Sequence, residues 1–154
     1  MVTTTTGSRR LGQAWLALCI AFVLHVVDES LTGFLGVYNP TVIALRDQLP
    51  WFPMPVFEFN AWLSGLIIVN IFLLLLSPLV FQSVAWMRPV AYVFAVIMLA
   101  NGLGHTLGTI AGQTVSSVRF PRPMPGFYSS PLLISASIVL LYRLRKSGRT
   151  LQQP

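Results

Sequence analysis

The stretch Leu11–Leu35, which reads LGQAWLALCIAFVLHVVDESLTGFL, decides the fold class of this chain. It is long enough for a helix to cross the roughly 30 Å hydrocarbon core of a bilayer, which takes about 20 mostly apolar residues. It nevertheless contains His25, Asp28 and Glu29, although the whole chain has only 2 histidines and 4 acidic residues. Ionisable groups are costly at membrane depth, so this pattern predicts a membrane helix that carries a functional site.

The composition of the whole chain also indicates a membrane protein. Of its 154 residues 55% are hydrophobic and only 9% are charged, with a mean hydropathy of +0.72, which excludes an ordinary soluble domain. The last of its apolar segments reaches spanning length only if its helix begins near Phe127. We therefore expect an all-α fold, a bundle of four transmembrane helices. Three segments follow the first stretch: Val56–Phe81, Val90–Ile110 and Leu132–Tyr142 with its flanks.

The first stretch has one alternative interpretation, a cleaved signal peptide, because Arg9 and Arg10 precede it. It is longer than the apolar region of such a peptide, and it lacks a convincing small-x-small cleavage site, so we expect a retained span. Cys19 is the only cysteine, which excludes an intramolecular disulfide, and we expect it to pack as a small apolar residue.

The basic residues predict the orientation. Four spans place both termini on one side of the membrane, and seven of the ten basic residues lie on that side, which favours the cytoplasm. We expect cytoplasmic tails at residues 1–10 and 146–154 around one integral-membrane domain at residues 11–145. The net charge of +6 is then mainly a topology signal, and we expect no nucleic-acid partner. The three basic residues expected on the outer side are Arg46, Arg119 and Arg122.

The polar residues of the first and third segments are expected to converge. His25, Asp28 and Glu29 stand at i, i+3 and i+4 and share one helix face, and Asn101 and His105 stand one turn apart. At a rise of 1.5 Å per residue, both histidines lie about 20 Å from the cytoplasmic boundary. The site is therefore predicted inside the bundle, toward the outer leaflet, with these five residues as its catalytic candidates.

The loops supply secondary candidates. Glu58 and Asn60 open the second segment near the outer boundary and are second choices for the site. We expect Asn39-Pro40-Thr41 to end the first helix, and residues 41–49 to form a short amphipathic outer helix.

The loop before the fourth segment is rich in proline and glycine, which predicts a stiff turn that re-enters the bundle. Its two basic residues, Arg119 and Arg122, are candidates to neutralise the carboxylates or to bind an anionic headgroup. The plainer alternative is that both are solvated loop charges.

At this point the residues resemble a known family. His25-Val26-Val27-Asp28-Glu29 is similar to the signature of the HXXEE-domain proteins, with Asp28 in place of the first glutamate. Asn101-x-x-x-His105 and Pro125-Gly126 are similar to later polar motifs of that family. The resemblance covers nearly the whole chain, and it implies a small four-span membrane protein that is suspected of being an enzyme. The missing methylene at Asp28 is a departure from the family pattern.

Two kinds of chemistry suit this residue set. His25, Glu29 and His105 are ligand types for zinc with an open position, or for iron held by two histidines and a carboxylate. Asn101 or Glu58 would then orient a ligand. Without a metal, neighbouring carboxylates in a low-dielectric site share a proton that a histidine can accept or return.

That acid–base chemistry suits isomerisation, cyclisation or hydrolysis of a lipophilic substrate entering from the bilayer, with Asn101 orienting His105 or the substrate. Three alternatives remain open. They are a small proton-coupled transporter, an accessory subunit, and a structural network in which His25 pairs with Glu29 and Asn101 pairs with His105. A homo-oligomer is compatible with each of them.

Overall fold

The computed structural model describes residues 6–113 and 118–149, and these residues form six helices and no named strand. The prediction of an all-α fold is confirmed. The helices are α1 (Thr6–Thr32), α2 (Leu35–Gln48), α3 (Phe59–Leu75), α4 (Ser77–Phe81), α5 (Met87–Ala111) and α6 (Ser130–Arg149).

Within the described part of the chain, three helical stretches are long and apolar enough to cross a membrane: α1, α5, and α3 together with α4 over Phe59–Phe81. α6 does not reach this standard in the described residues, because its helix begins at Ser130 instead of near Phe127. Residues 125–129 form turns instead. The C-terminal turns of α6 also carry Arg143, Arg145 and Lys146, which shorten its apolar length.

The predicted end of the first helix at Asn39-Pro40 is wrong. α1 ends at Thr32, because Gly33 adopts a left-handed conformation with φ of 78°. The amide of Phe34 then donates to the carbonyl oxygen of Glu29 at 3.0 Å, which closes a Schellman cap. Pro40 lies inside α2, so the outer helix begins earlier than predicted and is longer.

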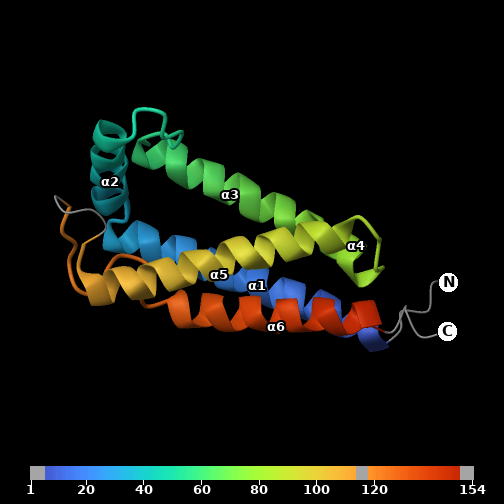
Figure 1. The fold of residues 1–154 in the computed structure, drawn as a ribbon. Helices are drawn as coiled ribbons and strands as arrows, with labels where there is room; N and C mark the ends of the chain where they lie inside the picture. Colours follow the sequence, from blue (N-terminus) through green and yellow to red (C-terminus); the bar gives the residue numbers. More distant parts are fainter. Residues whose placement is uncertain (1–5, 114–117, 150–154) are drawn as a thin grey trace.

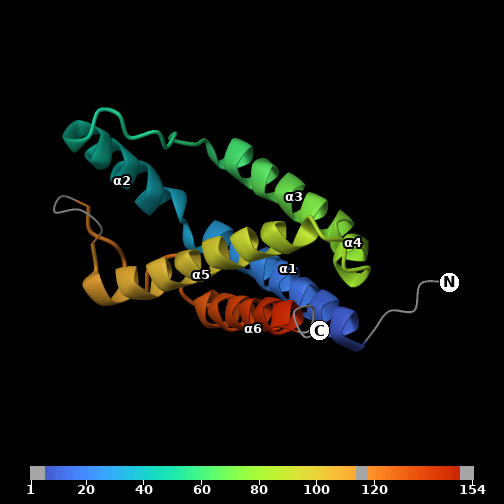
Figure 2. The same ribbon diagram turned by 45° about the vertical axis from the view of Figure 1, so that its right-hand side comes forward.

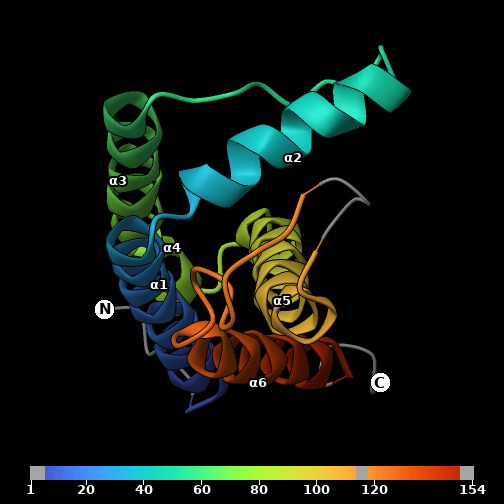
Figure 3. The same cartoon turned by 90° about the vertical axis from the view of Figure 1, so that its left-hand side faces the viewer.

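The centre of the helical bundle is formed by α1, α5 and α6. α6 lies against both α5 and α1, whereas α3 and α4 follow the other side of α1 (Figures 1 and 2). The start of α1 and the end of α6 lie at the end of the bundle occupied by α4, and α2 lies across the opposite end (Figure 1). Seen along the bundle, α2 projects away from the other helices (Figure 3).

The core of the α4 end is apolar. Trp15 is fully buried, its ring lies 5.3 Å from that of Phe94, and its indole N–H donates to Ser77 Oγ at 3.1 Å. The outward faces of the spans are apolar as well: Ile68, Leu75 and Ile110 are each at least 66% exposed. Helices that pack a core on one face and expose apolar side chains on the other are typical of proteins surrounded by lipid.

α2 is held mainly by loop contacts. Both ends of the Asn39 amide bond to the backbone of Phe57, at 2.8 and 3.0 Å, and Arg46 donates to the carbonyl of Met54. Its inner face contributes Val37 to a small buried cluster with Phe120 and Met124. This arrangement makes α2 one wall of the space beside the polar residues of α5.

Candidate functional site

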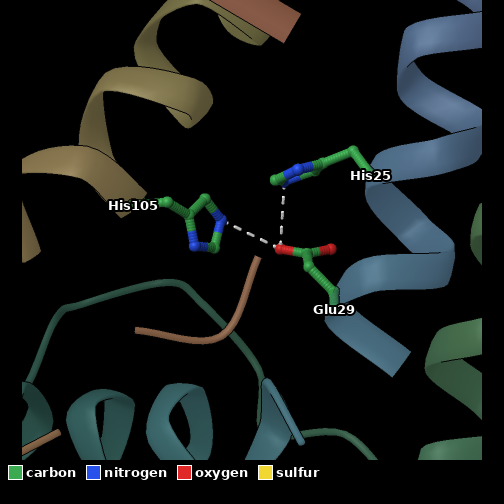
Figure 4. A group of neighbouring side chains, drawn as sticks. All are labelled: His25, Glu29 and His105. Carbon is green, nitrogen blue, oxygen red and sulfur yellow. Dashed lines mark ion pairs between the residues drawn. The ribbon is translucent and has the colours of Figure 1, made fainter. Parts of the chain in front are cut away.

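Three buried side chains meet at the end of the bundle near α2. Glu29 Oε1 lies 3.0 Å from His105 Nε2 and 3.4 Å from His25 Nε2. Figure 4 shows the carboxylate of α1 reaching toward both imidazoles, one from its own helix and one from α5. All three residues are at most 4% exposed, so this cluster, called the His–Glu–His cluster below, is shielded from solvent.

Local helix geometry places two of the three groups. His25 and Glu29 stand one turn apart on α1, which aligns their side chains on one face. His105 comes from α5, which contacts α1 only weakly along its backbone. The side chains therefore bridge the space between the helices, and the two imidazole rings meet edge to face with centroids 4.8 Å apart.

The loop before α6 fixes His105. The Nδ1 atom of His105 makes a short hydrogen bond with the carbonyl oxygen of Pro125, which can only accept, so this nitrogen carries a proton. Gly126 follows with φ of +82°, and a Cβ there would lie 2.8 Å from His105 Nδ1 and 3.0 Å from Glu29 Cγ. The amide of Gly126 donates to Thr32 Oγ1 at 3.1 Å, which ties the loop to the end of α1.

A second chain of hydrogen bonds fixes His25. Its Nδ1 lies 2.8 Å from Ser129 Oγ, and Ser129 Oγ donates to Asp28 Oδ2 at 2.8 Å. Because the single hydroxyl proton is directed to the carboxylate, Ser129 accepts from a protonated Nδ1 of His25. Asp28 Oδ2 also accepts the amide N–H of Ser129 at 2.8 Å, so one carboxylate caps α6 and orients His25.

Asn101 acts on a different histidine from the one predicted. Its Nδ2 lies 3.1 Å from His25 Nε2, and not against His105 on its own helix. The physical reason is that the His105 ring is turned away, with one nitrogen on Pro125 and the other on Glu29. Asp28 also departs from expectation, because it bonds to Ser129 and does not share a proton with Glu29.

The tautomers leave one shared proton in the cluster. With both Nδ1 atoms protonated, the unprotonated Nε2 of His25 accepts the Asn101 amide N–H at 3.1 Å, and the Nε2 of His105 faces Glu29 Oε1. A proton must lie between Glu29 and His105, because two lone pairs at 3.0 Å repel each other. The arrangement can therefore hold and release a proton between a carboxylate and two histidines.

An apolar pocket opens beside the cluster. It has a volume of about 250 Å³ and reaches His105 and Asn101, so polar groups stand at one end of an apolar chamber. Tyr38 donates its hydroxyl to Pro55 O at 3.0 Å, and burial raises the pKa of its phenol, which keeps it protonated. The pocket is lined by Phe34, Val37, Tyr38, Thr41, Ala100, Asn101, Gly104, His105 and Met124.

Some predicted residues lie elsewhere. Glu58 and Asn60 are exposed at the start of α3 and take no part in the cluster. Arg122 does not face the carboxylates, because its guanidinium donates to the carbonyls of Ile110 and Ala111 at 3.4 and 3.2 Å. It caps the C-terminus of α5, where a cation is favourable. Arg119 is exposed.

Sequence reasoning missed the role of three residues. The sequence assigned no role at the site to Ser129 or Thr32, and Pro125 was singled out only through the family resemblance, without a contact to His105. A hydroxyl next to a helix start is a recognisable signal, but its partner cannot be found by sequence spacing, because Asp28 is 101 residues away.

Comparisons with protein-family models, with curated proteins and with solved structures found no match. The class of the protein is therefore defined by its own architecture. Over residues 6–113 and 118–149 it is all-helical, with three helices that can cross a membrane and a buried His–Glu–His cluster that could hold a metal ion.

Proposed function

We propose that this chain is a membrane-embedded enzyme that acts on a lipophilic substrate by proton transfer at the His–Glu–His cluster. The observation that carries the proposal is the position of the Glu29 carboxylate, buried against two histidines beside an apolar pocket. An ionisable group is costly to bury in a membrane protein, so its presence there indicates a functional role. The resemblance to the HXXEE-domain family agrees with this function and remains part of the proposal.

The proposal includes a fourth span and a topology. α6 spans about 30 Å over its 20 residues if Arg143 and its basic neighbours extend toward the headgroups. Both termini then lie in the cytoplasm. The His–Glu–His cluster, which is near the C-terminal end of α1, lies toward the outer leaflet. A lipophilic substrate would enter the pocket laterally from that leaflet.

The chemistry follows from the proton held between Glu29 and His105. The pocket reaches His105, so a substrate seated there exchanges a proton with the pair, and Asn101 offers an amide to orient a polar group. Isomerisation, cyclisation and hydrolysis are the reaction classes that need such a reversible acid and base.

The volume of the pocket limits the size of the substrate group that can enter it. About 250 Å³ lies just below the usual range of ligand sites, roughly 300–1,000 Å³. It holds one ring system or a short chain segment with a single polar group, and the rest of a longer lipid would remain in the bilayer.

The test uses a matched pair of glutamates. Purified wild-type protein in lipid nanodiscs is incubated with a total lipid extract, and products are separated by liquid chromatography and mass spectrometry, with retention time identifying isomers. Glu29→Gln should lower product formation at least about 100-fold, as loss of an acid–base group does. Glu58→Gln, which changes an exposed carboxylate, should leave it unchanged.

A third variant addresses the pocket. Gly104 lines it and a Cβ there meets nothing within 4 Å, so Gly104→Leu should fill the chamber and reduce turnover without unfolding α5. Gly65→Leu on α3, which is equally unobstructed, is the control. If no lipid changes but proteoliposomes show proton-coupled uptake that Glu29→Gln abolishes, the chain is a carrier and the enzyme proposal is wrong.

A further inference from the structure

We propose that the His–Glu–His cluster binds one divalent transition-metal ion. The donor atoms of the cluster are those that favour zinc. This inference does not depend on the chain being an enzyme. Two imidazole nitrogens and one carboxylate oxygen are the three protein ligands of a zinc site that keeps a fourth position open. His25, Glu29 and His105 offer one such atom each, and all three atoms lie within 4.8 Å of one another.

The first argument is the spacing of the donor atoms. In a tetrahedral zinc site with bonds near 2.0–2.1 Å, neighbouring ligand atoms lie about 3.3 Å apart. Glu29 Oε1 lies 3.0 and 3.4 Å from the two Nε2 atoms, which is close to that edge length on both sides. The two histidine nitrogens lie within 4.8 Å of each other and must approach by up to about 1.5 Å, which side-chain torsions can supply.

The second argument is independent of the first and concerns the opposite side of each imidazole. Histidines that ligate metals almost always donate their other ring nitrogen to a carboxylate, carbonyl or similar acceptor, which fixes the tautomer. Both histidines do so here. His105 donates its Nδ1–H to the carbonyl of Pro125. His25 donates its Nδ1–H to Ser129 Oγ, and the Ser129 hydroxyl in turn donates a hydrogen bond to Asp28.

The third argument is charge. The Nε2 atoms of His25 and His105 lie 3.4 and 3.0 Å from the same carboxylate oxygen. A proton between Glu29 and His105 satisfies one of these contacts, and His25 Nε2 accepts from the Asn101 amide instead. A divalent cation satisfies all three donors at once and replaces that proton. Binding should therefore release about one proton per ion, and the affinity should fall as the pH is lowered, because protons compete for the same atoms.

The position of the pocket suggests where the fourth ligand lies. Asn101 and His105 line the pocket, so the side of the cluster toward α2 is open to a water or a substrate oxygen. The amide of Asn101 donates toward His25 Nε2 at present. With a metal bound, the amide must turn so that its oxygen faces the site, an exchange that a side-chain amide makes by rotation.

The experiment is a metal titration of the full chain in detergent micelles. The protein is treated with a chelator, dialysed, and titrated with ZnCl₂ against a fluorescent competitor, with bound metal measured by mass spectrometry. We expect one zinc per chain. Glu29→Gln and His105→Gln should each lower the affinity at least 100-fold, and Ser129→Ala should lower it 10- to 100-fold, as the loss of an orienting partner does.

Two controls separate a metal site from general damage. Glu58→Gln changes an exposed carboxylate and should bind zinc as the wild type does, and Cys19→Ala removes the only thiol with the same expectation. Circular dichroism and gel filtration verify that each variant is folded. If a ligand variant fails to fold, Ser129→Ala still decides the question, because it keeps all three ligands.

The proposal is overturned if the folded wild type binds none of Zn²⁺, Co²⁺ and Fe²⁺ stoichiometrically. It is also overturned if zinc binds equally well to the wild type and to Glu29→Gln, since the ion is then elsewhere. Lipid turnover by a metal-free wild type, lost in Glu29→Gln, would support the proposed enzyme independently, and the zinc titration alone decides the metal site.

Discussion

The two ends of the bundle are built from the same helices but by different means. At the α4 end, Trp15 of α1 and Phe94 of α5 are part of a continuous apolar core, and the Trp15–Ser77 bond is a local addition to it. At the α2 end, the same two helices carry His25, Glu29 and His105, and hydrogen bonds from the loop before α6 fix them.

This difference separates packing contacts at one end from directed polar contacts at the other. Close packing at the α4 end depends on shape and tolerates few voids. The α2 end depends on directed hydrogen bonds, which hold polar groups that would otherwise be too costly to bury. We therefore expect changes at the two ends to affect different measurements.

The largest expected effect on stability is at the apolar end. Trp15→Ala should lower the free energy of unfolding by about 3 kcal/mol, because it leaves a cavity and removes the partner of Ser77. The measurement is a denaturation titration in mixed micelles. Trp86→Ala is the matched control, since Trp86 is 52% exposed, and its effect should remain within about 0.5 kcal/mol. Equal effects of the two variants would contradict the assignment of the core.

The next largest effect is at the α2 end, where one variant should change both stability and zinc binding. Gly126→Ala forces a non-glycine residue to φ of +82° and places a Cβ against His105 and Glu29, so it should cost about 2 kcal/mol. Zinc binding should weaken as well, because His105 is displaced from the Pro125 carbonyl. Gly36→Ala, where a Cβ meets nothing within 4 Å, should change neither quantity. Unaltered zinc affinity in Gly126→Ala would show that the loop does not position the cluster.

The smallest effect compares two glycines on one helix. A Cβ at Gly102 would lie 2.8 Å from Ile134 Cγ1 and 3.2 Å from the carbonyl of Ser130, so α6 packs directly on this position. Gly102→Ala should destabilise the protein by about 1 kcal/mol, the cost of overpacking less the gain in helix propensity. Gly104→Ala meets no atom and should be neutral or stabilising by up to about 1 kcal/mol in the same denaturation titration. The reverse order would place the α5–α6 contact elsewhere.

Much of the fold was predictable because helical periodicity is local. The apolar stretches 56–81 and 90–110 correspond to α3 with α4 and to α5, with ends that differ by a few residues. The errors occurred where a single backbone conformation decides the outcome. Gly33 ends α1 early through its left-handed φ, whereas Pro40, the more conspicuous residue, lies within a helix.

The site was predictable in part for the same reason. The spacing of His25 and Glu29 places them on one face of any helix that contains them, and the structure brings His105 to them from α5. The partner of Asn101 was predicted incorrectly, because ring orientation depends on the Pro125 carbonyl.

The sequence by itself determined that the chain is helical and apolar, and which face of α1 bears the rare ionisable groups, because both follow from composition and a 3.6-residue period. Only the tertiary structure decided that Ser129 and Pro125 hold the two imidazoles with both Nε2 atoms toward Glu29. Those contacts join residues far apart in the chain along a loop without periodicity. The path of that loop is set by packing against α1 and α5, and no local rule specifies it.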